Sequence, residues 1–219
     1  MNVEIWADIA CPWCYLGLHR FETALAGFEH RDEVTVRWRS FELDPSAPRE
    51  AGVDTATHLA AKYGMTRDEA VASQQRLTDI AAADGLQVRL DLARIGSTFD
   101  AHRLVHLASE HGRSEAVAER LMRAYHAEGE PVSDPATLTK LAAEAGLPAE
   151  EVDELLAGER FAADVREDER LAETLGIGGV PFFVADRTFA ASGAQSPAVL
   201  GELLRRAFAA APAARVSRD

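Results

Sequence analysis

The sequence predicts an α/β protein in which two mixed segments flank a long helical block. Three observations support this. Strand-like runs of β-branched and aromatic residues occur near the two ends of the 219-residue chain. The middle is rich in Ala, Leu, Glu and Arg and has helical periodicity. The chain has two cysteines, Cys11 and Cys14, and their C-x-x-C spacing lies between a predicted strand and a predicted helix.

The N-terminal segment reads as strand, helix, strand. Residues 3–7 are an apolar run, and residues from Pro12 to about Phe28 carry an apolar stripe with helical spacing. Residues 34–41 alternate with a period of two, as in a half-buried strand. The pair Asp44-Pro45 then ends regular structure.

The middle segment predicts about five helices between Thr55 and Gly158. Stretch 86–95 is the exception and is compatible with extended chain. Helix starts are indicated by two capping boxes and one Asp-Pro pair, namely Thr66–Glu69, Ser97–Asp100 and Asp134–Pro135.

The C-terminal segment predicts a helix, two strands and a last helix. We expect these elements over 161–175, 180–184, 188–191 and from Ser196 to about Ala209, with a turn at 186–187. Without the helical block, the element order is that of a thioredoxin fold. The predicted fold class is therefore α/β, a thioredoxin-like fold with an inserted all-helical domain. Residues 1–48 and 159–219 would form the discontinuous thioredoxin-like domain, and residues 49–158 the insertion.

The C-x-x-C spacing after a strand and before a helix is typical of thiol–disulfide exchange. At the start of a helix, Cys11 faces unpaired N–H groups and the positive end of the helix dipole, and both favour its thiolate. We expect Cys11 to be the nucleophile and Cys14, one turn further in, to resolve the mixed disulfide. Pro12 and Trp13 are expected to contact the substrate.

A metal site is the alternative use of these residues. Zinc needs four ligands, and no further cysteine exists in the chain. His102, His106 and Glu110 share one helical face, but their order is not that of a zinc protease. We therefore predict no metal site, and we expect His102 to lie near the cleft and contact the substrate.

Two C-terminal segments complete the expected site. In a thioredoxin fold, a cis proline precedes the third strand, so we predict a cis bond between Val180 and Pro181; an ordinary trans proline is the alternative. The backbone of Val180 would then pair with an extended substrate. Further on, N–H groups of Ser192, Gly193 and Gln195 could hold a carboxylate such as that of glutathione. A plain helix entry explains the same residues.

Charge and hydropathy exclude several classes of partner. The net charge of −13 argues against nucleic acid and against an anionic membrane surface. No apolar run approaches the length of about 20 residues that a membrane span needs. The chain starts with a strand-like run and no secretory leader pattern, so we expect a cytoplasmic protein, either a monomer or a homodimer.

The chain resembles the FrnE-like branch of the DsbA family. The segments that carry the resemblance are Asp8–Gly17, Phe41–Pro45, Ala101–Leu104, Gly176–Val184 and Ser192–Gln195. The resemblance implies a thioredoxin fold with a helical insertion, dithiol–disulfide oxidoreductase activity through Cys11 and Cys14, and a cis Pro181. Related kappa-class glutathione transferases and 2-hydroxychromene-2-carboxylate isomerases use glutathione, and typically carry serine at the position of Cys11.

The leading hypothesis is a protein-disulfide oxidoreductase or isomerase. It would act on a protein or small-molecule thiol or disulfide, with no tightly bound cofactor and with glutathione as a candidate co-substrate. Glutathione-dependent isomerisation or conjugation of a small aromatic substrate is the second enzymatic hypothesis. A redox-responsive binding module is the hypothesis that needs no turnover.

Overall fold

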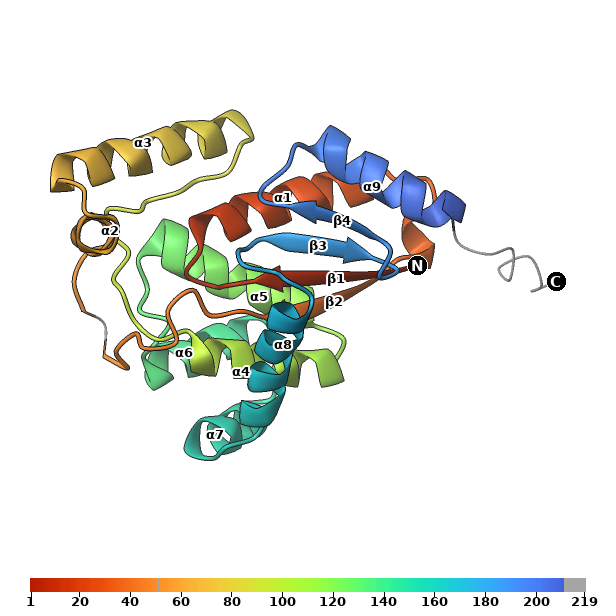
Figure 1. Cartoon of the computed structure of the whole chain (residues 1–219). Helices are drawn as coiled ribbons and strands as arrows, with labels where there is room; N and C mark the ends of the chain where they lie inside the picture. Colours follow the sequence, from red (N-terminus) through yellow and green to blue (C-terminus); the bar gives the residue numbers. More distant parts are fainter. Residues whose placement is uncertain (51, 211–219) are drawn as a thin grey trace.

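A four-stranded mixed sheet forms the centre of the protein (Figure 1). The computed structural model describes residues 1–50 and 52–210. The strand order is β2-β1-β3-β4, with β2 parallel to β1 and the other neighbouring pairs antiparallel. The strands are β1 (Asn2–Ala7), β2 (Thr35–Ser40), β3 (Phe182–Ala185) and β4 (Phe189–Ser192). Each lies within two residues of its predicted bounds, and the predicted α/β thioredoxin-like class is confirmed.

Helices cover both faces of this sheet. Helices α1 (Pro12–Ala26) and α9 (Pro197–Ala210) pack against each other on one face, and α8 (Ala162–Thr174) crosses the opposite face next to β2 (Figure 1). As a result β1 is buried on both sides, with Val3 and Ile5 in one core cluster and Trp6 in another. No helix in the described part of the chain is long and apolar enough to cross a membrane.

The middle of the chain is helical, as predicted, but is divided more finely than about five helices. After a 3-10 turn (Arg31–Glu33) and β2, the elements are α2 (Thr55–Tyr63), α3 (Arg67–Ala83), α4 (Phe99–Glu110), α5 (Ser114–Arg123), a π-helical turn (Ala124–Glu128), α6 (Pro135–Glu144) and α7 (Ala149–Ala157). Residues 86–95 are irregular, apart from one isolated bridge between Arg94 and Asp54.

Two of the three predicted helix starts are confirmed. Thr66 and Glu69 form a capping box at α3, and Asp134 accepts the Thr137 N–H at the start of α6. The third is displaced by one residue: a helix does start there, but Thr98 and not Ser97 is the N-cap of α4, no side chain caps it, and Ser97 Oγ accepts the N–H of Phe99 from outside the helix.

One hydrophobic cluster joins the sheet to the helical block. It runs from Val3 and Ile5 in β1, through Leu18 in α1, to Leu104 in α4 and Leu121 in α5. The helical block is therefore held against the sheet and α1 by shared apolar packing. The boundaries proposed for a separate insertion, 49–158, stay a prediction.

Candidate active site at the start of α1

Cys11 occupies the N-cap of α1, directly after the loop that follows β1. Its backbone is extended, with φ −87° and ψ 112°, and Pro12 takes the first helical position. The N–H groups of Cys14 and Tyr15 donate to its carbonyl oxygen at 3.0 and 3.2 Å. Its sulfur lies 3.8 Å from the carbonyl oxygen of Val180. The structure thus brings Cys11 and Val180 together, although they are far apart in sequence.

Cys14 lies one turn further along α1 and is the more deeply buried thiol, with 1% of its surface exposed. Burial raises the pKa of the Cys14 thiol well above its usual value, and the hydrogen bond and charge of Cys11 raise it further. Both cysteines are free thiols. Cys14 is therefore protonated at neutral pH in this reduced form.

The peptide bond between Val180 and Pro181 is cis, as predicted. The Pro181 ring packs directly onto α1 at Gly17. A Cβ atom built on Gly17 would lie 2.7 Å from Pro181 Cγ, which is far inside van der Waals contact. The absence of a side chain at Gly17 lets the loop before β3 approach the C-x-x-C helix.

Polar groups of the loop from Ser192 to Gln195 are hydrogen-bonded to other groups of the protein. The Gly193 N–H donates to the Pro181 carbonyl oxygen at 2.8 Å, and the Gln195 N–H donates to the Gly193 carbonyl oxygen at 2.8 Å. The Gln195 side chain donates to the Ser192 carbonyl oxygen at 2.7 Å. The Gly193 and Gln195 N–H groups that could hold a carboxylate already have protein acceptors, which favours the plain helix entry.

Asp8, in the loop before Cys11, is held by several donors. It accepts the N–H groups of Ala10 and Leu43 at 3.2 and 2.7 Å, and His102 Nε2 lies 3.5 Å from its Oδ1. Burial opposes its ionisation, but His102 and the Leu43 N–H together hold the pKa of Asp8 below its usual value. Asp8 is therefore a buried carboxylate beside the cysteines.

His102 contacts Asp8 and is only 3% exposed. It therefore presents almost no surface to a substrate, and its predicted contact with substrate stays a prediction. His106 instead contacts Ser40 and Asp168, and Glu110 pairs with Arg160. Among the described residues, no group of three or more His, Cys, Asp or Glu side chains could hold a metal ion.

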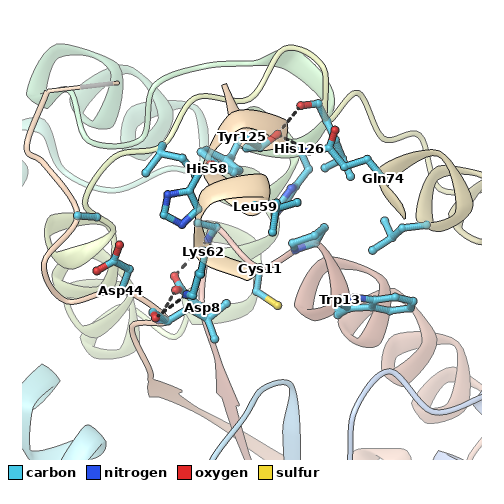
Figure 2. A pocket seen from close by; sticks show the side chains of 18 of the residues that line it. Asp8, Cys11, Trp13, Asp44, His58, Leu59, Lys62, Gln74, Tyr125 and His126 are labelled. Atoms are coloured by element: carbon cyan, nitrogen blue, oxygen red, sulfur yellow. Dashed lines mark hydrogen bonds between the residues drawn. The ribbon is translucent and has the colours of Figure 1, made fainter. Parts of the chain in front are cut away.

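A pocket of about 450 Å³ opens beside Cys11 (Figure 2). This volume is typical of small-molecule sites. Cys11 lies between Asp8 and Trp13 in Figure 2, and Trp13 is 44% exposed. Other lining side chains come from α2, α3, the irregular stretch and the π-helical turn, among them His58, Leu59, Lys62, Gln74, Leu77, Leu90, Ile95, Tyr125 and His126.

The pocket residues of α2, α3 and the π-helical turn were not predicted from the sequence. His126 is the most unusual of them, since it is fully buried and its pKa is lowered to about 4, mainly by burial. The π-helical turn is too short and too irregular to show the repeat of apolar residues by which a helix is predicted from sequence. Conversely, Val180, Pro181, Ser192, Gly193 and Gln195 are not among the residues that line this pocket.

Comparison with known structures supports the same fold. A probable DsbA oxidoreductase from Streptomyces coelicolor is 50% identical, with a TM-score of 0.91 over 96% of this chain and 91% of that chain. The cytosolic disulfide reductase DsbM from Pseudomonas aeruginosa, solved with GSH, is 19% identical (TM-score 0.68; 95% and 100% covered). A 2-hydroxychromene-2-carboxylate isomerase is 15% identical (TM-score 0.66; 94% and 95% covered). These last two show likeness of fold alone.

Residues 2–205 match a single family description. The match spans all four strands and the whole helical block, so it includes both the C-x-x-C turn and the cis proline loop. The chain therefore belongs to the DSBA-like thioredoxin domain family.

Proposed function

We propose that this protein is a thiol–disulfide oxidoreductase with Cys11 as nucleophile and Cys14 as resolving thiol. The observation that carries the proposal is the asymmetry of the two cysteines. Cys11 lies at the N-terminus of α1, lines the pocket and faces the Val180 carbonyl, whereas Cys14 does not line the pocket, is more deeply buried (1% against 4% exposed) and has a raised pKa. Such an asymmetry suits one thiol for attack and the other for resolution.

Exchange proceeds through a mixed disulfide between Cys11 and the substrate. The Cys11 thiolate attacks one sulfur of a substrate disulfide, the S–S bond breaks, and the departing thiolate takes up a proton. Cys14 then loses its proton and attacks Cys11 Sγ, which forms the Cys11–Cys14 disulfide and releases the second substrate thiol. The protein is oxidised by two electrons and the substrate disulfide is reduced. The reverse sequence oxidises a dithiol substrate.

Substrate could approach Cys11 from two sides. The Val180 carbonyl lies on one side, where an extended peptide could pair with the backbone. The pocket lies on the other and has the volume to take a small thiol such as glutathione. We propose protein or small-molecule disulfides as substrates and glutathione as a co-substrate.

Single-cysteine variants test the assignment. We expect Cys11→Ser to abolish reduction of insulin and of small disulfides. Cys14→Ser should still form a mixed disulfide at Cys11 but fail to release it, so mass spectrometry should find the adduct. Undiminished activity in Cys11→Ser, or adducts that form at Cys14 with equal ease, would contradict the proposal.

A second candidate is glutathione-dependent isomerisation or conjugation of a small aromatic substrate. The pocket favours it, because apolar side chains such as Leu59, Leu77 and Leu90 line much of the space beside Cys11. This function requires saturable binding of reduced glutathione to the resting enzyme. Calorimetry that detects no binding at millimolar glutathione would remove it.

We further propose that the protein works in the cytoplasm, as a monomer or a homodimer. Its structural relative from Pseudomonas aeruginosa is described as cytosolic. A cytoplasmic location agrees with two cysteines used as a dithiol rather than as a structural disulfide. Cell fractionation with an antibody tests the location, and sedimentation equilibrium tests the state of association.

A further inference from the structure

His126 has one ring nitrogen engaged and one without a protein partner. Its Nε2 lies 3.0 Å from the carbonyl oxygen of Ile9, while Nδ1 is buried and has no hydrogen-bond partner among the described residues. A carbonyl oxygen can only accept, so Nε2 carries the proton. In the neutral ring Nδ1 is then an unprotonated acceptor. An unpaired buried acceptor is costly unless a ligand satisfies it.

The ring is held rigidly at the wall of the pocket. Tyr15 stacks on it at 5.5 Å with an interplanar angle of 14°, and Tyr125 meets it edge-on at 4.9 Å. It projects from the π-helical turn Ala124–Glu128, and π-helical turns occur frequently at functional sites. Burial keeps the ring neutral over the physiological range. The ring is therefore a fixed, neutral group at the wall of the pocket, and its Nδ1, which is closed to solvent in the free protein, has no hydrogen-bond partner among the described residues.

His126 is tied through Nε2 to the loop that carries the reacting sulfur. Its partner Ile9 lies two residues before Cys11, and both His126 and Cys11 line the same pocket. In a peptidic disulfide, the cysteine's own amide N–H is only a few bonds from its sulfur. A substrate joined to Cys11 through that sulfur can therefore bring an amide N–H to the wall that carries His126.

We propose that His126 Nδ1 accepts a hydrogen bond from an amide N–H of the disulfide that Cys11 attacks. His126 is then a specificity-determining residue that favours cysteinyl peptides over disulfides without a donor. The inference rests on the proposed oxidoreductase function and adds a substrate class to it.

Two probe disulfides separate the inference from that function. Oxidised glutathione carries amide N–H donors, whereas 2,2′-dithiodipyridine carries none. Each oxidises the reduced protein to its Cys11–Cys14 disulfide and yields two equivalents of its own thiol. The single-turnover rate can be followed by fluorescence, because Trp13 lies between the two cysteines.

The variant His126→Gln keeps a donor for Ile9 through its Nε2, and its acceptor oxygen Oε1 does not occupy the position of the histidine Nδ1. We expect it to slow the reaction with oxidised glutathione about three- to tenfold, the size of one hydrogen bond, while the rate with dithiodipyridine stays within about twofold. His111→Gln, outside this pocket, should leave both rates unchanged. Equal slowing with both probes, or no slowing with either, would overturn the inference. Cys11→Ser reacting as fast as wild type would instead overturn the proposed function.

A measurement on the native histidine covers the case in which His126→Gln fails to fold. In Cys14→Ser, oxidised glutathione should trap a mixed disulfide at Cys11. Nitrogen-15 NMR of the histidine side chains should show the Nε2–H tautomer of His126 before and after trapping, with Nδ1 shifting towards a hydrogen-bonded value afterwards. A proton on Nδ1 in the free protein, or an unchanged Nδ1 resonance in the adduct, would refute the proposal.

Discussion

At the residue scale, Gly17 shows how a missing side chain shapes the site. Alanine there would place Cβ 2.7 Å from Pro181 Cγ and 3.4 Å from Ala194 Cα. The gain in helix propensity, about 1 kcal/mol, is outweighed by overpacking of about 1–3 kcal/mol against a rigid ring. We expect Gly17→Ala to lower the free energy of unfolding in urea and to slow oxidation by dithiodipyridine.

The matched control is Gly27→Ala at the end of the same helix. A Cβ atom there would come no closer than 3.8 Å to the nearest atoms, and the backbone is already right-handed. It should leave both the stability and the rate nearly unchanged. If the two variants behave alike, the Gly17–Pro181 contact has no special role.

Glu22 is a second residue whose surroundings have a measurable effect, in this case on its pKa. It lies on α1, and burial together with Glu115 and Glu119 raises its pKa to about 7. An acid with a raised folded-state pKa weakens the fold once it ionises. The contribution of protonated Glu22 to the free energy of unfolding is therefore fully present below about pH 4.3, its pKa in the unfolded chain. It is lost as the pH rises through about 7, its pKa in the folded protein.

The variant Glu22→Gln removes that penalty. We expect it to raise the free energy of unfolding by about 1 kcal/mol at pH 8, after allowance for solvent screening, and to have no effect at pH 4. Urea titrations at both values measure this, with the exposed Glu29→Gln as control. A gain of equal size at both pH values would contradict the assigned cause.

At the scale of elements, a buried ion network fastens α8 to the sheet. Arg39 in β2 donates to Glu4 in β1 through Nε at 2.9 Å, and to Asp168 in α8 at 2.6 Å. Trp6 Nε1 donates to the Asp168 carbonyl oxygen at 3.2 Å. The side chains of Arg39, Glu4 and Asp168 are all nearly buried. Their mutual ion pairs therefore offset the free energy that each charge loses when it is removed from water.

Removal of the central cation, Arg39, should therefore destabilise the fold strongly. We expect Arg39→Met to lower the free energy of unfolding by about 3–5 kcal/mol, because it removes the buried cation that Glu4 and Asp168 share and leaves them only Arg187 and His106 as charged or titratable neighbours. Arg37→Met, on the exposed part of the same strand, should change it by less than about 0.5 kcal/mol. Chemical denaturation measures both. A small effect at Arg39 would contradict this and would show that Arg187, which already donates to Glu4 at 3.0 Å, suffices to hold that carboxylate.

At the scale of the whole molecule, the sheet and the helical block share one hydrophobic cluster. Such continuity predicts a single cooperative unfolding transition. The three tryptophans, Trp6, Trp13 and Trp38, all lie outside the helical block, whereas far-ultraviolet circular dichroism reports helices throughout the chain. We expect the two signals to change at the same urea concentration. Loss of helical signal before tryptophan fluorescence changes would show that residues 49–158 unfold separately.

Long-range packing explains the sequence-based expectations that the structure changes. His102 was expected beside the substrate but contacts Asp8 and is almost fully buried. The Gly193 N–H, a candidate for binding a carboxylate, is taken by the Pro181 carbonyl oxygen. In each case a partner distant in sequence decides the outcome.

The sequence by itself determined the features that depend on neighbouring residues. Helix capping, strand periodicity and the placement of a C-x-x-C turn before α1 are local, so the order of elements and the position of Cys11 could be read directly. Only the tertiary structure decided what surrounds Cys11. The pocket exists because α2, α3, the stretch 86–95 and the π-helical turn converge on it, and their packing leaves His126 Nδ1 without a protein partner. No local pattern encodes that convergence, because its contacts join residues far apart in the chain.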